Sequence, residues 1–173
     1  AYMLDFSEAI DDSFEQVSLA SEDTFVDNGY STVWTVYTTP ENYLGKIESV
    51  RLALVAMADK SDARMITLKM PEVTQIPPYA FSKDREGNNS YSDNLIHNLY
   101  AFEGENVESV VNYAFYMSHI CRLSLPKVKF IGFYAFARTD NLRELDFPEL
   151  TEVGEGAFLW CENLVSANLP KLE

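Results

Sequence analysis

One pattern recurs along the last two thirds of the chain and constrains its fold more than any other feature. An apolar stretch ends in Pro, a Val/Leu-x-x-Ile/Val segment follows, and a short turn closes on Ala-Phe, as in 123–136 and 145–158. Further copies lie at 68–81 and 102–115, and 167–172 begins another. The later copies are 21 or 22 residues apart. A fixed period of this length predicts a solenoid of stacked coils, each contributing one strand to a parallel sheet.

Three apolar positions of the repeat predict the interior of the coils. They form three columns: Leu68, Phe102, Leu123, Leu145 and Ala167; Val73, Val107, Val128, Leu150 and Leu172; and Ile76, Val110, Ile131 and Val153. The Phe of each Ala-Phe pair is expected to fill the space between coils. Because side chains alternate across a strand, a fourth column should face outward. It is polar and mixed in charge: Lys69, Glu103, Ser124, Asp146 and Asn168.

Residues 1–64 lack the repeat and are predicted to form a separate N-terminal unit. Residues 14–19 and 32–38 alternate apolar and polar residues around a turn signal at 27–29, which predicts two strands joined by a long loop. The run Thr39-Pro40-Glu41 is typical of a helix start, and the helix should end near 59–62. Apolar residues recur at helical spacing: Tyr43, Leu44, Ile47, Val50, Leu54, Val55 and Ala58. Because a solenoid needs its first coil covered, residues 1–64 are predicted to be an α+β cap on a solenoid over 65–173.

One step of the repeat is longer than the others. From Pro71 to Glu105, which takes the Pro position, the step is 34 residues. The additional residues, near 82–98, are mostly polar and include Tyr91. Such a composition predicts an inserted loop, and loops on rigid scaffolds often carry recognition.

Composition and charge limit the possible partners. The net charge is −14, and residues 1–30 hold no Lys or Arg. Phosphates of nucleic acids or anionic membranes would be repelled. No apolar run approaches the roughly 20 residues of a membrane span. The acidic cluster at 23–28 does not reproduce a calcium-binding loop, so it is interpreted as a contribution to solubility.

The two cysteines and two histidines do not suggest an active site. Cys121 lies six residues after Phe115, where later copies have Leu, and Cys161 lies three after Phe158. Both offsets are expected to face inward, two coils apart, which exceeds the usual reach of a disulfide. Two free buried thiols are predicted. His119 lies near Cys121, but a nucleophilic Cys must be exposed and a metal needs three or four convergent ligands. No catalytic residue, metal or cofactor is expected.

Aromatic residues are the stronger candidates for binding. Tyr79, Tyr113 and Tyr134 each lie two residues before a repeat Phe, and stacking would align them. Such a ladder either holds the coils in register or forms a contact surface with polar tips. The candidate binding residues are Tyr79, Tyr113, Tyr134, Tyr91, Tyr116 and Trp160.

The copies at 123–136 and 145–158, read as Leu-x-Leu/Phe-Pro-x-Val/Leu-x-x-Ile/Val-Gly-x-x-Ala-Phe, resemble the BspA-like, treponemal type of bacterial leucine-rich repeat. Cys161 stands where this type has its Cys, whereas Glu105 replaces Pro and Pro77 and Val111 replace Gly. The resemblance implies a secreted or cell-surface bacterial protein, often lipid-anchored. It also implies adhesion and binding of host or neighbouring-cell proteins.

The sequence therefore predicts an α/β solenoid, a short right-handed leucine-rich-repeat coil of parallel strands with an N-terminal α+β cap. The expected function is non-enzymatic protein recognition or adhesion at a bacterial surface. Two alternatives remain open, a structural spacer of a larger surface protein and a hydrolase that uses residues 1–64. The repeat stops within a copy after Leu172, and such an open edge favours self-association or a longer natural chain.

Overall fold

The structure is a computed structural model that describes residues 24–27, 31–59, 65–83 and 96–173. Within these residues one helix, α1 (Tyr43–Asp59), lies between the second and third strands. The longer strands are β1 (Thr24–Asp27), β2 (Ser31–Thr35), β3 (Met65–Lys69), β5 (Leu99–Glu103), β7 (Arg122–Ser124), β9 (Glu144–Asp146) and β11 (Ser166–Asn168). The two-residue strands are β4 (Gln75–Ile76), β6 (Ser109–Val110), β8 (Phe130–Ile131) and β10 (Glu152–Val153).

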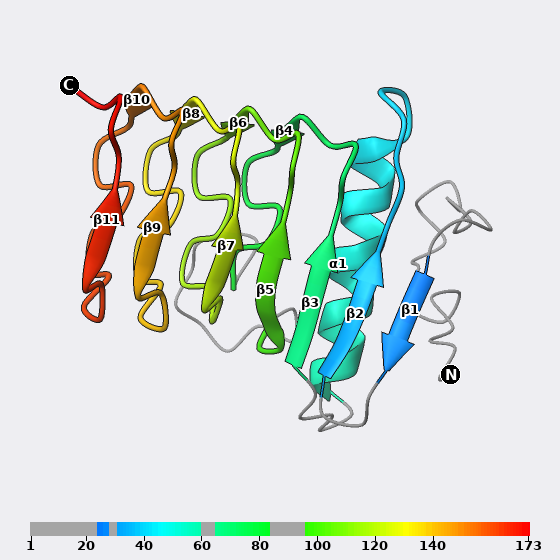
Figure 1. Cartoon of the computed structure of the whole chain (residues 1–173). Helices are drawn as coiled ribbons and strands as arrows, with labels where there is room; N and C mark the ends of the chain where they lie inside the picture. Colours follow the sequence, from blue (N-terminus) through cyan, green and yellow to red (C-terminus); the bar gives the residue numbers. More distant parts are fainter. Residues whose placement is uncertain (1–23, 28–30, 60–64, 84–95) are drawn as a thin grey trace.

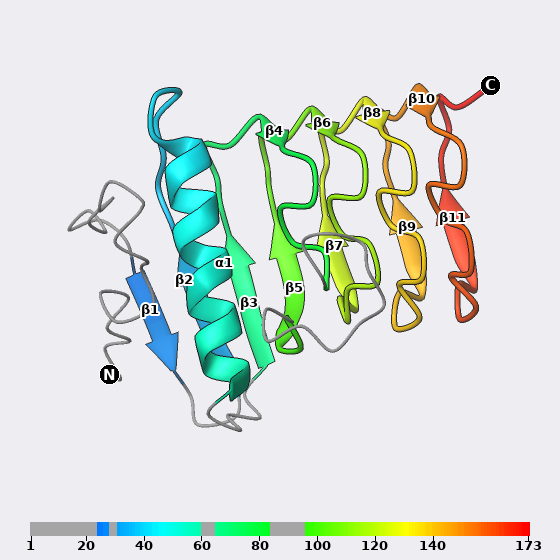
Figure 2. The same cartoon turned by 180° about the vertical axis from the view of Figure 1, so that it is seen from behind.

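The repeats form parallel sheets, as predicted. The main sheet has the order β1-β2-β3-β5-β7, in which only the β1–β2 pair is antiparallel. The strands β9 and β11 form a separate parallel pair, and β4, β6, β8 and β10 form a second parallel sheet. Figure 1 shows the longer strands side by side and the two-residue strands along the upper edge. Seen from behind in Figure 2, α1 lies across β2 and β3.

The predicted interior columns are confirmed in the middle coils and become exposed at the last one. Nine of their residues, from Leu68 to Leu150, have at most 1% of their surface exposed. They are Leu68, Phe102, Val73, Val107, Val128, Leu150, Ile76, Val110 and Ile131. In the last coil Val153 and Leu172 are partly exposed, and Ala167 is exposed, contrary to prediction. No described coil covers these side chains, so the same position of the repeat is buried in the middle coils and exposed at the end of the array.

The phenylalanines of the Ala-Phe pairs stack through the core. The rings of Phe115 and Phe136 lie 5.0 Å apart between centroids, and those of Phe136 and Phe158 lie 5.6 Å apart with a 1° interplanar angle. Phe81, Phe115 and Phe136 are fully buried. Each contact joins adjacent coils, so the predicted filling of the space between coils is confirmed.

The predicted helix is present, and its start follows the expected capping chemistry. The backbone N–H of Asn42 donates to Thr39 Oγ1 at 3.2 Å, and the N–H of Thr39 donates to Asn42 Oδ1 at 2.7 Å. This reciprocal pair satisfies two amides that the first turn leaves unpaired. The helix ends at Asp59, inside the predicted range of 59–62. Its apolar face is narrower than predicted, because Leu44 is 54% exposed.

Two buried basic residues of α1 hold the neighbouring backbone. Lys46 Nζ donates to the carbonyl of Tyr37 at 2.5 Å. Arg51 Nη1 donates to the carbonyls of Tyr79, Ala80 and Ser82, at 3.4, 3.3 and 2.7 Å. A charge-assisted donor on three carbonyls of one turn fixes the helix against the first Ala-Phe turn.

The prediction for the two strands before the helix is correct in part. The strand expected at 32–38 is β2, and the chain reverses between β1 and β2 at the predicted turn signal. The strand expected at 14–19 and most of the insertion near 82–98 lie outside the described residues. The strand β1 was not predicted.

The main sheet is interrupted between β7 and β9. These two strands share no hydrogen-bonded ladder, although β8 and β10 of the same two coils are paired. The turn before β7 is one residue shorter, since Phe115 and Leu123 are eight residues apart whereas Phe136 and Leu145 are nine apart. A shorter turn changes where the strand begins relative to its neighbour, which explains the lost pairing.

The residue missing from the short turn is the counterpart of Asn141. In the longer turns an Asn side chain joins successive coils, because Asn141 Nδ2 donates to the carbonyl of His119 at 3.3 Å and Asn163 Nδ2 to that of Asp140 at 2.7 Å. Aligned on the strands, Ile120 takes the interior place of Leu142, and both are fully buried. Leu123, predicted to be interior, is partly exposed at the break.

Truncation of the interior stack should be costly. Phe136→Ala should lower the free energy of unfolding by about 3 to 5 kcal/mol, because it removes a buried ring and leaves a cavity. Glu144→Ala is the control, since that side chain is exposed and should change stability by less than about 0.5 kcal/mol. Urea unfolding of both variants gives the comparison, and equal losses would contradict the assignment of Phe136 to the core.

Lengthening the short turn should repair the sheet. Insertion of one asparagine between His119 and Ile120 restores the spacing of the later turns. We expect β7 and β9 to pair. The free energy of unfolding should rise by about 1 kcal/mol, which is the net contribution of one or two hydrogen bonds. Amide hydrogen exchange of β7 measures the effect. An insertion that leaves these amides unprotected would show that turn length does not cause the break.

Candidate functional site

The aromatic residues predicted from the repeat come together on one face of the coils. The Tyr79 and Tyr113 rings stack with centroids 5.0 Å apart and a 3° interplanar angle. Tyr113 and Tyr134 continue the stack at 5.5 Å and 7°. Tyr116 and Phe133 meet the Tyr113 ring edge-on at 5.4 and 5.7 Å. We call these five residues the aromatic face. All five are partly exposed to solvent.

The backbone of the turn sets this alignment. Tyr79, Tyr113 and Tyr134 have φ of 57°, 58° and 52°, in the left-handed region, and Gly156 takes the same place in the next coil with φ of 66°. In this conformation the next-but-one amides point to the neighbouring coil, where Phe81 and Phe115 donate to the carbonyls of Ala114 and Ala135 at 2.7 and 2.8 Å. One turn geometry thus places Phe inward in each coil and Tyr at the surface in three of them.

The tyrosine stack ends differently at its two sides. A Cβ at Gly156 would lie 2.9 Å from carbons of the Tyr134 ring, so the glycine backbone covers that ring directly. At the other end Tyr79 faces α1 across a groove. The hydroxyl of Tyr113, in the middle, has a pKa above its ordinary value, because burial and the neighbouring Tyr79 disfavour its charged form. Its hydroxyl is therefore protonated at neutral pH.

The other predicted aromatic residues are not part of this face. Trp160 belongs to a second column of left-handed residues, with Met117 and Arg138, and its ring lies 4.4 Å from the Arg138 guanidinium carbon. It is 51% exposed. Tyr91 lies outside the described residues. Sequence reasoning did not include Phe133 in the site, although its place directly before Tyr134 was a usable signal.

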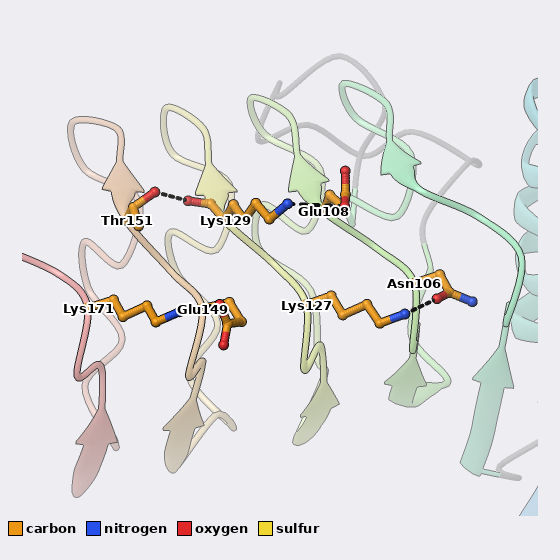
Figure 3. A network of polar contacts seen from close by, with 7 residues as sticks. All are labelled: Asn106, Glu108, Lys127, Lys129, Glu149, Thr151 and Lys171. Carbon is orange, nitrogen blue, oxygen red and sulfur yellow. Dashed lines mark hydrogen bonds and ion pairs between the residues drawn. The ribbon is translucent and has the colours of Figure 1, made fainter.

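The polar residues on the coils largely pair with one another from coil to coil. Figure 3 shows Lys127 donating to Asn106 Oδ1 at 2.6 Å and Lys129 paired with Glu108 at 3.2 Å. Lys171 pairs with Glu149 in the same manner at 2.5 Å. On the predicted outward column of the main sheet, Lys69 pairs with Glu103 at 3.2 Å and Asn168 Nδ2 donates to Asp146 Oδ1 at 2.8 Å. These contacts satisfy the charges between coils.

The cysteines are free, as predicted, but Cys121 is not in the interior column. It lies at the mouth of the β7–β9 break, partly exposed, and its thiol points to the carbonyl of His119 at 3.6 Å rather than to the imidazole. The error arises because counting from Phe115 ignores the shorter turn. Cys161 contacts Thr139 Oγ1 and the carbonyl of Phe136, both at 3.1 Å. It faces inward as predicted but is only partly buried.

Neither thiol is activated. Burial raises the pKa of Cys121, and burial also raises the pKa of Cys161 despite its hydrogen bond with Thr139. Both therefore stay protonated at neutral pH, which does not suit a nucleophile. Among the described residues no group of three or more His, Cys, Asp or Glu could hold a metal ion. Within the described residues, no helix is both long enough and apolar enough to cross a membrane.

Two hollows flank the turn that carries Asp140 and Asn141. One, of about 620 Å³, is lined by Arg122, Arg143 and Glu144; the other, of about 450 Å³, by Lys83, Arg138, Trp160 and Glu162. Both sit beside the short turn before β7. Acidic and basic side chains alternate in them, so they show no preference for one charge.

The comparison with protein families identifies the repeats. Residues 87–172 match the family described as BspA type Leucine rich repeat region (6 copies). This half of the chain is therefore a leucine-rich-repeat segment of the BspA type. The coil that contains β3 and β4 precedes the matched residues and pairs with the next coil, with the repeat positions Leu68 and Phe102 opposite each other and one register shift between Ile66 and Thr67. Neither the curated proteins nor the solved structures compared with the chain include a match.

The two histidines near the short turn should titrate below the ordinary value. Their rings meet edge-on at 5.6 Å. Burial, followed by the charge of Lys83, lowers the pKa of His97 and of His119. The neutral forms are thus favoured in the folded protein, so this contribution to stability is complete above about pH 6.5 and declines as pH falls through the lowered values.

An NMR titration of the imidazole protons should give both midpoints below about 6.5. Lys83→Met should move both upward, because it removes one of the two main causes. Midpoints at or above 6.5 in the unmodified chain, or no response to Lys83→Met, would contradict the electrostatic account of this cluster.

Proposed function

We propose that the chain is a non-enzymatic recognition module that binds a protein partner through the aromatic face. The observation that carries the proposal is a continuous, partly exposed group of five aromatic rings on adjacent coils. Aromatic residues with polar tips are enriched at protein interfaces, because they supply apolar area and a hydrogen-bonding atom together. Leucine-rich-repeat segments are in general protein-binding modules, which supports this reading.

The remaining surface is less suited to this role. Several charged and amide side chains of the coils are held by neighbours within the chain, as with Lys129 and Glu108. A partner would have to replace these contacts, whereas the aromatic edges have apolar area still to bury. The outward column of the main sheet contains no aromatic residue.

We further propose that residues 1–64 cap a right-handed solenoid over 65–173. Ile47, Val50 and Leu54 of α1 belong to the same core as the first coils, and Arg51 holds the first Ala-Phe turn. Such contacts suit the closing unit of a repeat array. The proposed setting is a secreted or surface-exposed bacterial protein in which the module serves adhesion, as the BspA type of repeat suggests.

Replacement of two tyrosines by glycine tests the binding surface. Tyr113→Gly/Tyr134→Gly removes two rings but keeps the left-handed backbone, which glycine adopts without cost and which Gly156 already shows. Binding of a panel of purified extracellular-matrix proteins and glycans is measured by biolayer interferometry. We expect saturable binding of at least one protein, weakened at least tenfold by the double variant.

The matched control changes two residues of the polar outward column instead. Ser124→Ala/Asp146→Asn alters two exposed polar residues and should leave the affinity within about twofold, since surface changes of this kind are mild. Far-UV circular dichroism and urea unfolding confirm that both variants are folded. Equal loss in the two variants, or no saturable protein partner, would favour the structural-spacer alternative.

A further inference from the structure

A groove lies where the tyrosine stack meets α1. It has a volume of about 310 Å³ and is walled on one side by Leu44, Gly45 and Ile47 of α1. On the other side lie Pro77, Pro78, Tyr79 and Ala80 of the first Ala-Phe turn. A space of this size holds one large side chain rather than a drug-sized ligand.

The groove is the open end of the tyrosine stack. One face of the Tyr79 ring is covered by Tyr113, with nearly parallel rings 5.0 Å apart. The groove lies between Tyr79 and α1, and Tyr113 is not among the residues that line it. At the opposite end of the stack Gly156 closes the Tyr134 ring, so that end has no such space. The groove therefore lies at the end of the stack where, among the described residues, a further ring would extend it.

The walls of the groove are held in place before any ligand arrives. Arg51, buried on α1, donates to the carbonyls of Tyr79 and Ala80, which ties the two walls together. Leu44 is 54% exposed although it lies among apolar neighbours. Walls fixed in advance reduce the ordering cost that binding must overcome.

The charge of the groove and of the chain selects the flanking chemistry. Glu48 of α1 is the charged residue that lines the groove. The whole chain has a net charge of −14, which attracts cationic partners and repels anionic ones.

We propose that this groove binds an aromatic side chain of a protein partner, flanked by lysine or arginine, as an additional ring of the tyrosine stack. The incoming ring lies parallel to Tyr79 at the spacing of the stack, with its edges on Leu44 and Pro77. The flanking cations lie towards Glu48 and are attracted by the net negative charge of the chain. The inference rests on the proposed function, because it names the anchor residue of the partner that the aromatic face binds.

Four acetylated, amidated peptides serve as probes of the full chain. They carry tryptophan between two lysines, alanine between two lysines, proline between two lysines, and tryptophan between two glutamates. Two-dimensional ¹H–¹⁵N NMR follows the titrations. We expect the tryptophan–lysine peptide to shift the amides of Leu44, Gly45, Tyr79 and Ala80, and to bind at least tenfold more tightly than the other three.

Leu44→Gln removes the exposed apolar wall and should weaken this peptide at least tenfold. Met65→Gln is the matched control, because Met65 is 44% exposed and lies on β3 of the main sheet. It should change the affinity less than twofold. The stability of both variants should stay close to that of the parent chain, since each changes an exposed side chain.

Several results would overturn the inference. Equal binding of the alanine peptide would mean that charge alone acts, and preference for the proline peptide would assign the groove to a proline-rich segment. Shifts confined to Tyr113 and Tyr134, insensitive to Leu44→Gln, would leave the aromatic face as a binding surface without this anchor. A different result would overturn the proposed function instead. If the tryptophan–lysine peptide binds the groove but the Tyr113→Gly/Tyr134→Gly variant keeps its affinity for the protein partner, the groove assignment stands and the aromatic face is not the binding surface.

Discussion

The stacking of phenylalanine rings between coils is the interaction on which the rest of the structure depends. Each coil touches only its neighbours, so stability accumulates from one coil-to-coil contact after another. In each of these contacts a fully buried Phe meets the next, as Phe115 meets Phe136 at 5.0 Å. The small, buried Ala before it lets the two turns approach, and the Phe amide donates across the same gap. The surface tyrosines are aligned because the interior phenylalanines are.

Most of this arrangement could be predicted because each coil repeats the same chemistry at the same place. A column such as Ile76, Val110 and Ile131 identifies an interior position independently of any single residue. The helix start at Thr39 was equally local, since its capping partners lie within three residues. Predictions failed where neighbours decide burial, as for Ala167, which has the interior position but no described coil over it.

The short turn before β7 shows why counting along a repeat has a limit. Offsets measured from Phe115 put Cys121 in the core, but one deleted residue moves Ile120 there and leaves Cys121 at the surface. Counting backward from the strand would have given the correct assignment. The same deletion removes an Asn that elsewhere bridges two coils and coincides with the interruption of the main sheet. A change of one residue thus alters burial, pairing and surface shape together.

The candidate site was predictable only to the extent that it repeats. Tyr79, Tyr113 and Tyr134 share one offset and lie in one stack, whereas Trp160 has another offset and lies in another column. The groove at Tyr79 depends on α1, which has no repeat relation to the coils, so periodicity could not place Leu44 beside it.

The distribution of charge also favours the end of the tyrosine stack beside α1 as the place of recognition. Lysines of the coils, such as Lys129 and Lys171, are engaged with acidic residues of the adjacent coil, so their charges are largely compensated where they stand. The chain still has a net charge of −14, which acts on a charged partner at a distance. Such a field brings a cationic partner close without specifying where it binds. Specificity must come from shape and apolar contact, and the groove at Tyr79 offers both beside the acidic side chain of Glu48.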